Sequence, residues 1–239
     1  MFITFEGLDG SGKTTQVELL AGRLRAEGLE VVITREPGGT PLGEEIRSLV
    51  LHGGEMTPWA EAALYTASRA QHVEELIRPA LARGATVISD RYVDSSVAYQ
   101  GIARGLGLQR VLDLNLAAVG GLMPDLTVLI ELESGGAVAR MSDERDRIER
   151  EADGFHARAA EGYRTLAALF PERFLTVDRE ADLSVLDDPP CAGVGMEPAR
   201  RLRTRPHGDV FSAQRAVVDD GFGPVRLAFV LREIGRAHV

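Results

Sequence analysis

Short β-branched and aromatic runs alternate with amphipathic segments along the first 180 residues of the chain. The runs predict buried strands at residues 2–5, 29–34, 85–90, 126–132 and 173–178. The segments between them carry apolar residues at helical spacing and predict helices at residues 15–24, 44–51, 59–83, 108–119 and 152–169. Strands that alternate with helices favour an α/β fold, here a five-stranded parallel sheet flanked by helices.

The longest predicted helix covers residues 59–83. Its apolar stripe consists of Ala63, Ala67, Ala70, Val73, Leu76, Ile77, Ala80 and Leu81. Pro79 should kink this helix or end its regular part. Tyr65 and Arg69 are four residues apart and therefore share a face. The pair is either a core edge with an extended arginine or a slot that stacks and hydrogen-bonds a planar base.

The loop after the first strand reads Gly7-Leu8-Asp9-Gly10-Ser11-Gly12-Lys13-Thr14 and fits the phosphate-loop pattern G-x-x-x-x-G-K-[ST]. A strand before it and a helix after it are the context that this pattern requires. Backbone N–H groups of such a loop wrap a phosphate chain, Lys13 reaches the outer phosphates and the Thr14 hydroxyl faces Mg²⁺. The alternative is a glycine-rich turn without a ligand.

Ionisable residues stand where two further strands end, and ligands bind at the carboxyl ends of parallel strands. Arg35 and Glu36 follow the second strand, and their alternative is a solvated strand end. Asp90 closes the third strand, directly before Arg91. We expect Asp90 to hold Mg²⁺ or its water shell, the alternative being a cap on the following helix.

Two later segments add polar groups. Ser96, Tyr99 and Gln100 fall within about one helical turn and form a dense hydrogen-bonding set. Residues 138–150 interleave acids with the arginines Arg140, Arg145, Arg147 and Arg150. Such a run is usually a solvated helical face. Because phosphoryl transfer needs positive charge around the moving group, we interpret it as a mobile arginine-bearing lid at about residues 134–150.

Bulk properties narrow the function. A net charge of −9 and a pI near 5.1 argue against a nucleic-acid-binding protein, whose affinity rests on Lys and Arg. The single cysteine, Cys191, excludes an intrachain disulfide framework and favours a reducing, cytoplasmic location. No leader precedes the first strand, and no apolar run approaches the roughly 18 residues of a membrane span, so we expect neither export nor membrane insertion.

The composition changes near residue 180. Residues 181–239 carry clustered arginines, among them Arg200 and Arg203, but no sustained helical or strand period. One interpretation is a short accessory segment for a partner or a nucleic acid. The interpretation that we favour is a reading-frame error near residues 180–190, since residues 233–239 resemble translated adapter sequence. The predicted α/β domain is therefore residues 1–180, followed by an atypical tail.

The order of elements is that of nucleoside monophosphate kinases with a phosphate-loop NTPase fold, and five segments resemble one family, the bacterial thymidylate kinases. These segments are Phe5 to Thr15, Thr34 to Thr40, Ser68 to His72, Asp90 to Gln100 and Asp146 to Glu149. The resemblance spans about three quarters of the chain. It implies transfer of a phosphoryl group from ATP to dTMP with Mg²⁺, and a homodimer.

The resemblance also implies roles for matching residues. The ATP phosphates would lie on Gly7 to Thr14, and Asp9 would contact the acceptor nucleotide or its magnesium. Thymine would be stacked by Tyr65 and hydrogen-bonded by Arg69, Ser96 and Gln100. The acceptor phosphate would be held by Arg35, Arg47 and Arg91, and the sugar would lie near Glu36 and Tyr99. The residues implied for catalysis are Lys13, Arg91, Arg140, Arg145 and Arg147.

Three positions qualify this resemblance. Gly10 occupies a loop position that is basic in one subgroup of the family, which implies that the catalytic arginines come from the lid. Tyr65 stands where the family commonly has phenylalanine, so its hydroxyl needs a partner. Residues 133–137 lack the proline usual after this strand. The choice among the lid arginines therefore stays open.

Two other functions compete with the one that the resemblance implies. The first is a kinase for another nucleotide or deoxynucleoside. The second is a phosphate-loop ATP-binding regulatory module with little turnover, which would have no use for a second nucleotide pocket. Phosphoryl transfer to an already ionised phosphate needs no strong general base, so catalysis would consist of positioning and charge neutralisation.

Overall fold

The computed structural model describes residues 1–131 and 146–178. The chain divides into two compact units, Met1–Ala181 and Asp182–Val239, and the second lies outside the described residues. Both interpretations of the tail therefore stay predictions, as does the lid at residues 134–145.

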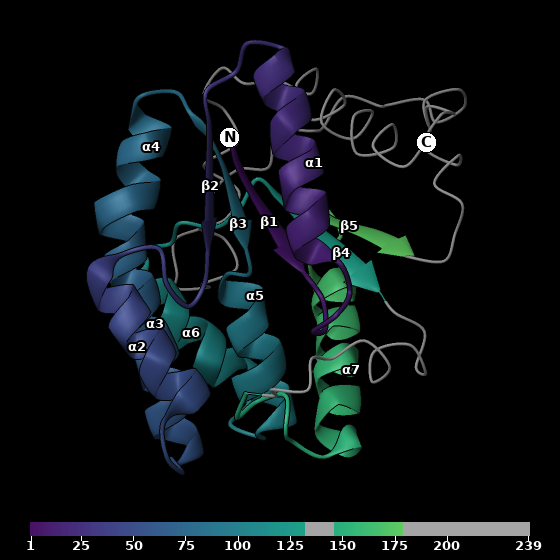
Figure 1. The fold of residues 1–239 in the computed structure, drawn as a ribbon. Helices are drawn as coiled ribbons and strands as arrows, with labels where there is room; N and C mark the ends of the chain where they lie inside the picture. The colour runs from purple at the N-terminus through teal and green to yellow at the C-terminus, as the bar shows by residue number, and fades with distance from the viewer. Residues whose placement is uncertain (132–145, 179–239) are drawn as a thin grey trace, which may run out of the picture. The chain divides into compact units, whose positions relative to one another are not determined.

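All five predicted strands are present in one parallel sheet of order β2-β3-β1-β4-β5 (Figure 1). The strands are β1 (Phe2–Glu6), β2 (Val31–Arg35), β3 (Thr86–Asp90), β4 (Leu126–Glu131) and β5 (Phe174–Asp178). Every residue of β1 is buried, as expected for a central strand covered on both faces. The first strand is thus fixed between β3 and β4.

Helices surround this sheet, with α1 crossing in front of the strands in Figure 1 and α2, α3 and α6 grouped on one side. The helices are α1 (Lys13–Ala26), α2 (Pro41–His52), α3 (Pro58–His72), α4 (Arg78–Ala82), α5 (Val93–Ser96), α6 (Leu108–Ala118) and α7 (Asp153–Leu169). Two π-helical segments, η1 (Val73–Ile77) and η2 (Val97–Ala103), continue α3 and α5. All the predicted helices are therefore confirmed, with shifted ends.

The α2 helix begins three residues earlier than predicted. Thr40 is its N-cap and accepts a hydrogen bond from the backbone N–H of Gly43 at 3.0 Å. Pro41 occupies the first turn, where the missing N–H costs nothing. Pro41 thus starts this helix.

The predicted long helix is interrupted before Pro79, as its sequence indicates. Regular α-helix ends at His72, and the π-helical turn η1 precedes the proline. The predicted apolar stripe is wrong in the first half of this helix, because Ala63 and Ala67 are exposed. The buried side chains of α3 are mostly polar instead, and among them Arg69 lines the pocket described below.

Candidate active site

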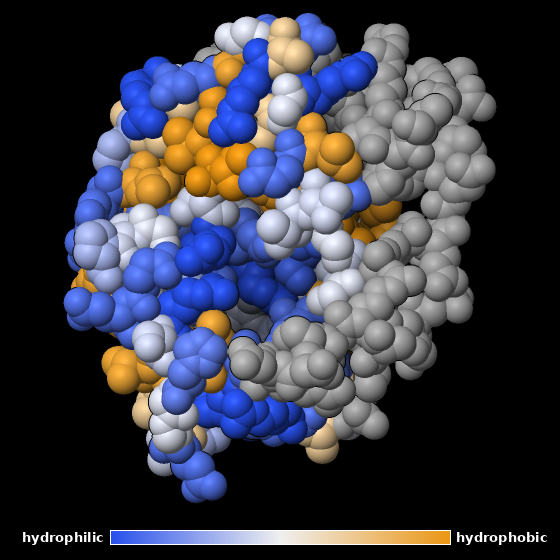
Figure 2. Space-filling model, viewed as in Figure 1, coloured by the Kyte–Doolittle hydropathy of each residue, from blue (hydrophilic) through white to orange (hydrophobic). Residues whose placement is uncertain are grey.

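The carboxyl ends of β1, β2 and β3 lie side by side, because Phe5 pairs with Asp90 and Arg35 pairs with Asp90 in the parallel register. A pocket opens above this edge, and Figure 2 shows a hollow lined by hydrophilic residues. It holds about 560 Å³ of empty space, which includes open solvent at its mouth. Its lining residues are Asp9, Glu36, Pro37, Arg47, Leu51, Tyr65, Arg69, Arg91, Ser95, Ser96, Tyr99, Gln100, Asp146 and Ile148.

The phosphate loop, residues 7–14, has the backbone that its glycines predict. Gly7, Gly10 and Gly12 adopt φ angles of 137°, 75° and 91°, which favour glycine. A Cβ atom on Gly7 would lie 2.4 Å from the carbonyl oxygen of Ile130, so only glycine fits between the loop and β4. The loop then enters α1 at Lys13, with its backbone arranged around the N-terminus of that helix.

Lys13 is buried beneath this loop. Its Nζ atom donates to the carbonyl oxygens of Gly7 at 3.1 Å and Leu8 at 2.8 Å. Burial, followed by the positive charge of Arg91, lowers the pKa of Lys13 to about 8. The ammonium group is thus poorly compensated by the protein, and an anionic phosphate beside it would stabilise its charge.

Thr14 and Asp90 meet across the sheet edge, as expected for a shared magnesium site. The Thr14 hydroxyl donates to Oδ2 of Asp90 at 2.9 Å. Tyr92, not Asp90, is the N-cap residue of α5, and α5 has no side-chain cap, so the alternative role of Asp90 as a cap is wrong. A hydroxyl and a carboxylate are oxygen ligands of the type that Mg²⁺ prefers.

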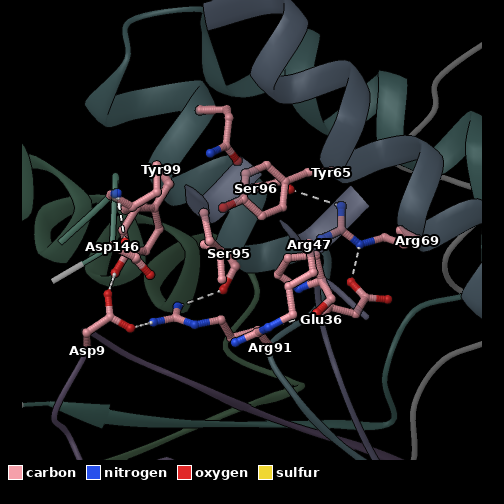
Figure 3. A pocket seen from close by; sticks show the side chains of 14 residues that line it. Asp9, Glu36, Arg47, Tyr65, Arg69, Arg91, Ser95, Ser96, Tyr99 and Asp146 are labelled. Atoms are coloured by element: carbon pink, nitrogen blue, oxygen red, sulfur yellow. Dashed lines mark hydrogen bonds and ion pairs between the residues drawn. The ribbon is translucent and has the colours of Figure 1, made fainter. Parts of the chain in front are cut away.

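Arg91 lies at the centre of the pocket and points toward Asp9 (Figure 3). Its Nη2 atom donates to Oδ1 of Asp9 at 2.6 Å, and its guanidinium carbon lies 5.3 Å from the centre of the Tyr99 ring. Burial alone would raise the pKa of Asp9, but the charges of Arg91 and Lys13 outweigh it and lower the pKa to about 2. Both groups are therefore charged at neutral pH.

Arg69 is buried at the opposite wall and held by groups from several elements. Its Nε atom donates to Glu36 at 2.6 Å, Nη1 donates to Ser96 at 3.0 Å and to Asn115, and Nη2 donates to the carbonyl oxygen of Tyr92 at 2.9 Å. An arginine has five N–H donors, and four have partners among the described residues. The guanidinium can thus offer one N–H to an acceptor in the pocket.

Glu36 is fixed from two sides. Besides Arg69, the ring Nδ1 of His72 lies 2.9 Å from Oε1 of Glu36, and Nε2 of His72 lies 2.6 Å from the Thr34 hydroxyl. Glu36 is 4% exposed, so the expected alternative of a solvated strand end does not hold for this residue. It lies beneath the pocket as a rigid acceptor.

Arg35 behaves differently from its neighbour. Its side chain is 56% exposed and pairs with Glu44 at 3.0 Å, outside the pocket lining. Arg35 is the last residue of β2 and Glu36 is the first residue of the loop after it, and their side chains point differently: Glu36 lines the pocket, whereas Arg35 is exposed. Arg47 does line the pocket, where its Nη1 donates to the carbonyl oxygen of Pro37 at 2.9 Å.

Of the predicted lid arginines, Arg140 and Arg145 lie outside the described residues. Arg147 is described, but the structure does not bring it into the pocket lining. Its Nη1 lies 2.7 Å from Glu61, and its Nε donates to the carbonyl oxygen of Val50 at 2.9 Å. Burial and then the nearby charge of Arg35 lower the pKa of Arg47. Arg47, Arg69 and Arg91 are the arginines of the described pocket lining.

Several site residues were missed by the sequence interpretation. Ser95 lines the pocket and accepts from Nη1 of Arg91 at 3.0 Å. It stands four residues before Tyr99, and this spacing could have identified it. Asp146 and Ile148 line the wall. They belong to the segment Asp146 to Glu149 that resembles the family, but the charged run around them assigned neither residue a role.

The described residues contain no group of three or more His, Cys, Asp or Glu side chains that could hold a metal ion by themselves. Magnesium is commonly held by one or two protein oxygens together with water and substrate phosphates. Thr14 and Asp90 fit this mode. Within the same residues, no helix combines the length and apolarity that crossing a membrane requires.

Comparisons with known proteins agree with this geometry. The family model "Thymidylate kinase" matches residues 5–188. A thymidylate kinase from Clavibacter sepedonicus is 54% identical over 182 residues, covering 74% of this chain and 86% of the relative, and one from Exiguobacterium sibiricum is 50% identical over 197 residues, covering 81% and 93%. The crystal structure of thymidylate kinase from Ehrlichia chaffeensis superimposes with a TM-score of 0.64 at 35% identity, covering 74% of this chain and 88% of that one. The chain belongs to the thymidylate kinase family.

Proposed function

We propose that this protein transfers the γ-phosphoryl group of ATP to dTMP and yields ADP and dTDP. The observation that carries the proposal is one pocket, adjoining a phosphate loop, that combines cations for a phosphate with groups for a base. Arg47 and Arg91 supply the cations, and Tyr65 and Arg69 lie on the base side. A regulatory ATP-binding module would not need this second set.

The proposed chemistry is an in-line displacement. A phosphate oxygen of dTMP forms a bond to the γ-phosphorus, the bond from that phosphorus to the β,γ-bridging oxygen breaks, and its electrons leave with ADP. Lys13 and Arg91 neutralise charge on the transferred group and the acceptor phosphate. The protein's contribution is positioning and electrostatics, since the nucleophile is already ionised.

The base side favours a carbonyl acceptor. Arg69 can donate one N–H into the pocket, as its other donors are bonded to Glu36, Ser96, Asn115 and Tyr92. Thymine and uracil present a carbonyl oxygen where cytosine presents an amino group, and two facing donors repel. We therefore expect dCMP to be a poor acceptor.

The residues that would hold Mg²⁺ are Thr14 and Asp90, with Asp9 close by in its ion pair with Arg91. When bound, the ion would supply positive charge that offsets the negative charge of the phosphates. We further propose, from the family resemblance, that Arg140 and Arg145 complete the cationic site, that the protein is a homodimer and that it is cytoplasmic.

The test is a coupled ADP-release assay with dTMP, dUMP, dCMP, AMP and thymidine as acceptors. We expect dTMP to have the highest kcat/KM. Preference for a different acceptor would support another nucleotide kinase, and ATP hydrolysis without any preference would support the regulatory module.

Lys13→Ala is the matching variant. We expect it to reduce kcat by at least about 100-fold, because the cation beside the outer phosphates is lost. The control is Arg83→Ala, which removes an exposed arginine that pairs with Glu30 at 2.7 Å before the amino ends of β3 and β2, the sheet edge opposite the site. Normal turnover by the Lys13 variant would contradict the assignment.

A further inference from the structure

Glu6 is a fully buried carboxyl group at the end of β1, and the proposed chemistry does not use it. Its Oε2 atom belongs to a triangle of three oxygens, the other two being the hydroxyls of Ser95 and Tyr163. The three edges are 2.6 Å from Glu6 to Ser95, 2.8 Å from Ser95 to Tyr163 and 2.9 Å from Tyr163 to Glu6. All three edges are therefore at hydrogen-bond distance.

Three O···O contacts of this kind need three protons. The two hydroxyls supply one each. If Glu6 is ionised it supplies none, and one edge brings two oxygens together without a hydrogen between them. If Glu6 is a neutral carboxylic acid, its own proton completes a closed ring. Its other oxygen, Oε1, accepts from the backbone N–H of Tyr92 at 2.8 Å, as a carbonyl oxygen does.

The closed ring can also accept hydrogen bonds from Arg91. Within the ring each hydroxyl oxygen donates once and accepts once, so one lone pair stays available on each. Nη1 of Arg91 donates to both of these oxygens, to Ser95 at 3.0 Å and to Tyr163 at 3.0 Å. The guanidinium is thus held on one side by the ring and on the other by Asp9.

We propose that Glu6 is a positioning residue that works as a neutral carboxylic acid, closing the ring with Ser95 and Tyr163 that orients Arg91. This inference deepens the proposed function and rests on it only for the role of Arg91 toward the acceptor phosphate. The three members come from β1, α5 and α7, so the ring also joins three elements around the arginine.

The surroundings of Glu6 support a neutral form. Burial and the negative charge of Asp94 on α5 raise the pKa of Glu6. The charge of Arg91 and the hydrogen bonds from the two hydroxyls lower it, but by less, so that the pKa is about 7. The other charged or titratable groups within its electrostatic reach are Lys13 on α1, Tyr99 on η2 and Arg173 before β5. The acid form is accordingly accessible near neutral pH.

The direct test is infrared difference spectroscopy of the full chain without nucleotides, wild type against Glu6→Gln. We expect a C=O stretching band of a protonated carboxyl at pH 6 in the wild type, absent from Glu6→Gln and lost on titration with a midpoint near pH 7. Glu30→Gln, at an exposed ion pair, is the matched control and should leave the band unchanged. Absence of a Glu6-dependent band at pH 6 would overturn the proposal.

Kinetics supply the second readout. Glutamine offers two N–H donors and can satisfy the same contacts, whereas leucine cannot. We expect Glu6→Gln to keep kcat/KM for dTMP within about 3-fold of wild type, and Glu6→Leu to lose at least roughly 10-fold. If Glu6 served instead as an ionised partner of Arg91, both variants would lose activity equally, which would overturn the proposal.

Two features keep the result interpretable. Should Glu6→Leu fail to fold, the infrared band and the Glu6→Gln kinetics still decide the protonation state. Because the spectra need neither dTMP nor turnover, they report on the ring even if the kinase assignment fails. A failed acceptor assay with an intact band would therefore count against the proposed function alone.

Discussion

Nη1 of Arg147 lies 2.7 Å from Oε2 of Glu61, a carboxylate that is 1% exposed. The same carboxylate accepts from Gln100 at 2.9 Å and from Arg104 at 3.0 Å. Arg147 also bonds through its backbone N–H to the carbonyl oxygen of Leu51 at 3.0 Å. Glu61 on α3 thus links Arg147 to Gln100 on η2, while Arg147 itself bonds to α2. Asp146 and Ile148, on either side of Arg147, line the pocket.

Glu61→Ala is expected to destabilise the protein by roughly 3–5 kcal/mol, because it removes the carboxylate that pairs with the largely buried Arg147 and leaves Arg104 with Glu151 alone. Urea unfolding of Glu61→Ala, Arg147→Met and the double variant measures this. The double variant should lose less than the sum of the two single variants, by at least about 0.5 kcal/mol.

The exposed pair Glu74–Arg78 at 2.8 Å is the control for this cycle, and its coupling should be below about 0.5 kcal/mol. Strict additivity at Glu61 and Arg147 would show that their contact has no energetic role. A parallel rise in KM for dTMP in Glu61→Ala would reflect the displaced pocket wall.

Arg69→Lys should mainly weaken acceptor binding. Lysine keeps the positive charge beside Glu36 but loses the planar fork that bonds Ser96 and Tyr92. We expect KM for dTMP to rise at least roughly 10-fold while kcat changes less than about 3-fold. Arg69→Ala is a poorer test, since it would also leave Glu36 buried without its cation.

The measurement is steady-state kinetics with dTMP varied at saturating ATP. Arg110→Lys provides a matched control at another arginine, which stacks on the exposed Trp59 at 4.9 Å. A fall in kcat with unchanged KM would move Arg69 from substrate binding to the chemical step.

Gly7→Ala should destabilise the protein by roughly 1–3 kcal/mol. The added Cβ would lie 2.4 Å from a backbone oxygen of β4, and the φ angle of 137° is strained for alanine. Gly22→Ala in α1 is the matched control, because nothing lies within 4 Å of its added Cβ. Thermal unfolding should show the control unchanged or more stable by up to about 1 kcal/mol, and equal stability of the two variants would refute this account of the loop.

The Asp9–Arg91 pair should make stability depend on acidic pH. The folded pKa of Asp9, about 2, lies below its usual 3.8, so its contribution is present above pH 3.8 and is lost as pH falls through 2. The shift corresponds to about 2 kcal/mol. The measurement is urea unfolding at pH 7, 4 and 2.5. Asp9→Asn should reduce the loss of stability between pH 4 and pH 2.5. Glu18→Gln, on the exposed face of α1, is the control and should not reduce that loss.

The sequence by itself determined the local elements and the phosphate site. Apolar runs predict all five strands because central parallel strands are buried on both faces, and the glycines of residues 7–14 leave the loop few alternatives. The meeting of Thr14 with Asp90 was predictable as well, since Asp90 ends β3 and Thr14 ends the phosphate loop that leaves the same edge of the sheet after β1.

Only the tertiary structure decided which of several polar residues face the pocket. Arg35 and Glu36 are neighbours in sequence, but Arg35 is exposed whereas Glu36 is buried, since Arg69 and His72 on α3 hold the Glu36 carboxylate. Arg147 belongs to a charged run whose pattern is the same for a catalytic lid and for a buried ion pair. The partner that distinguishes them, Glu61, is on a different helix.

The ring of Glu6, Ser95 and Tyr163 shows most clearly what the sequence alone could not predict. Ser95 and Tyr163 lie 68 residues apart, and Ser95 lies 89 residues from Glu6, yet the three oxygens touch. Hydrophobic periodicity specifies which side of an element is buried, but not which polar groups on different elements are brought within 3 Å of one another. That depends on how α5 and α7 pack against the end of β1, which is a property of the folded chain alone.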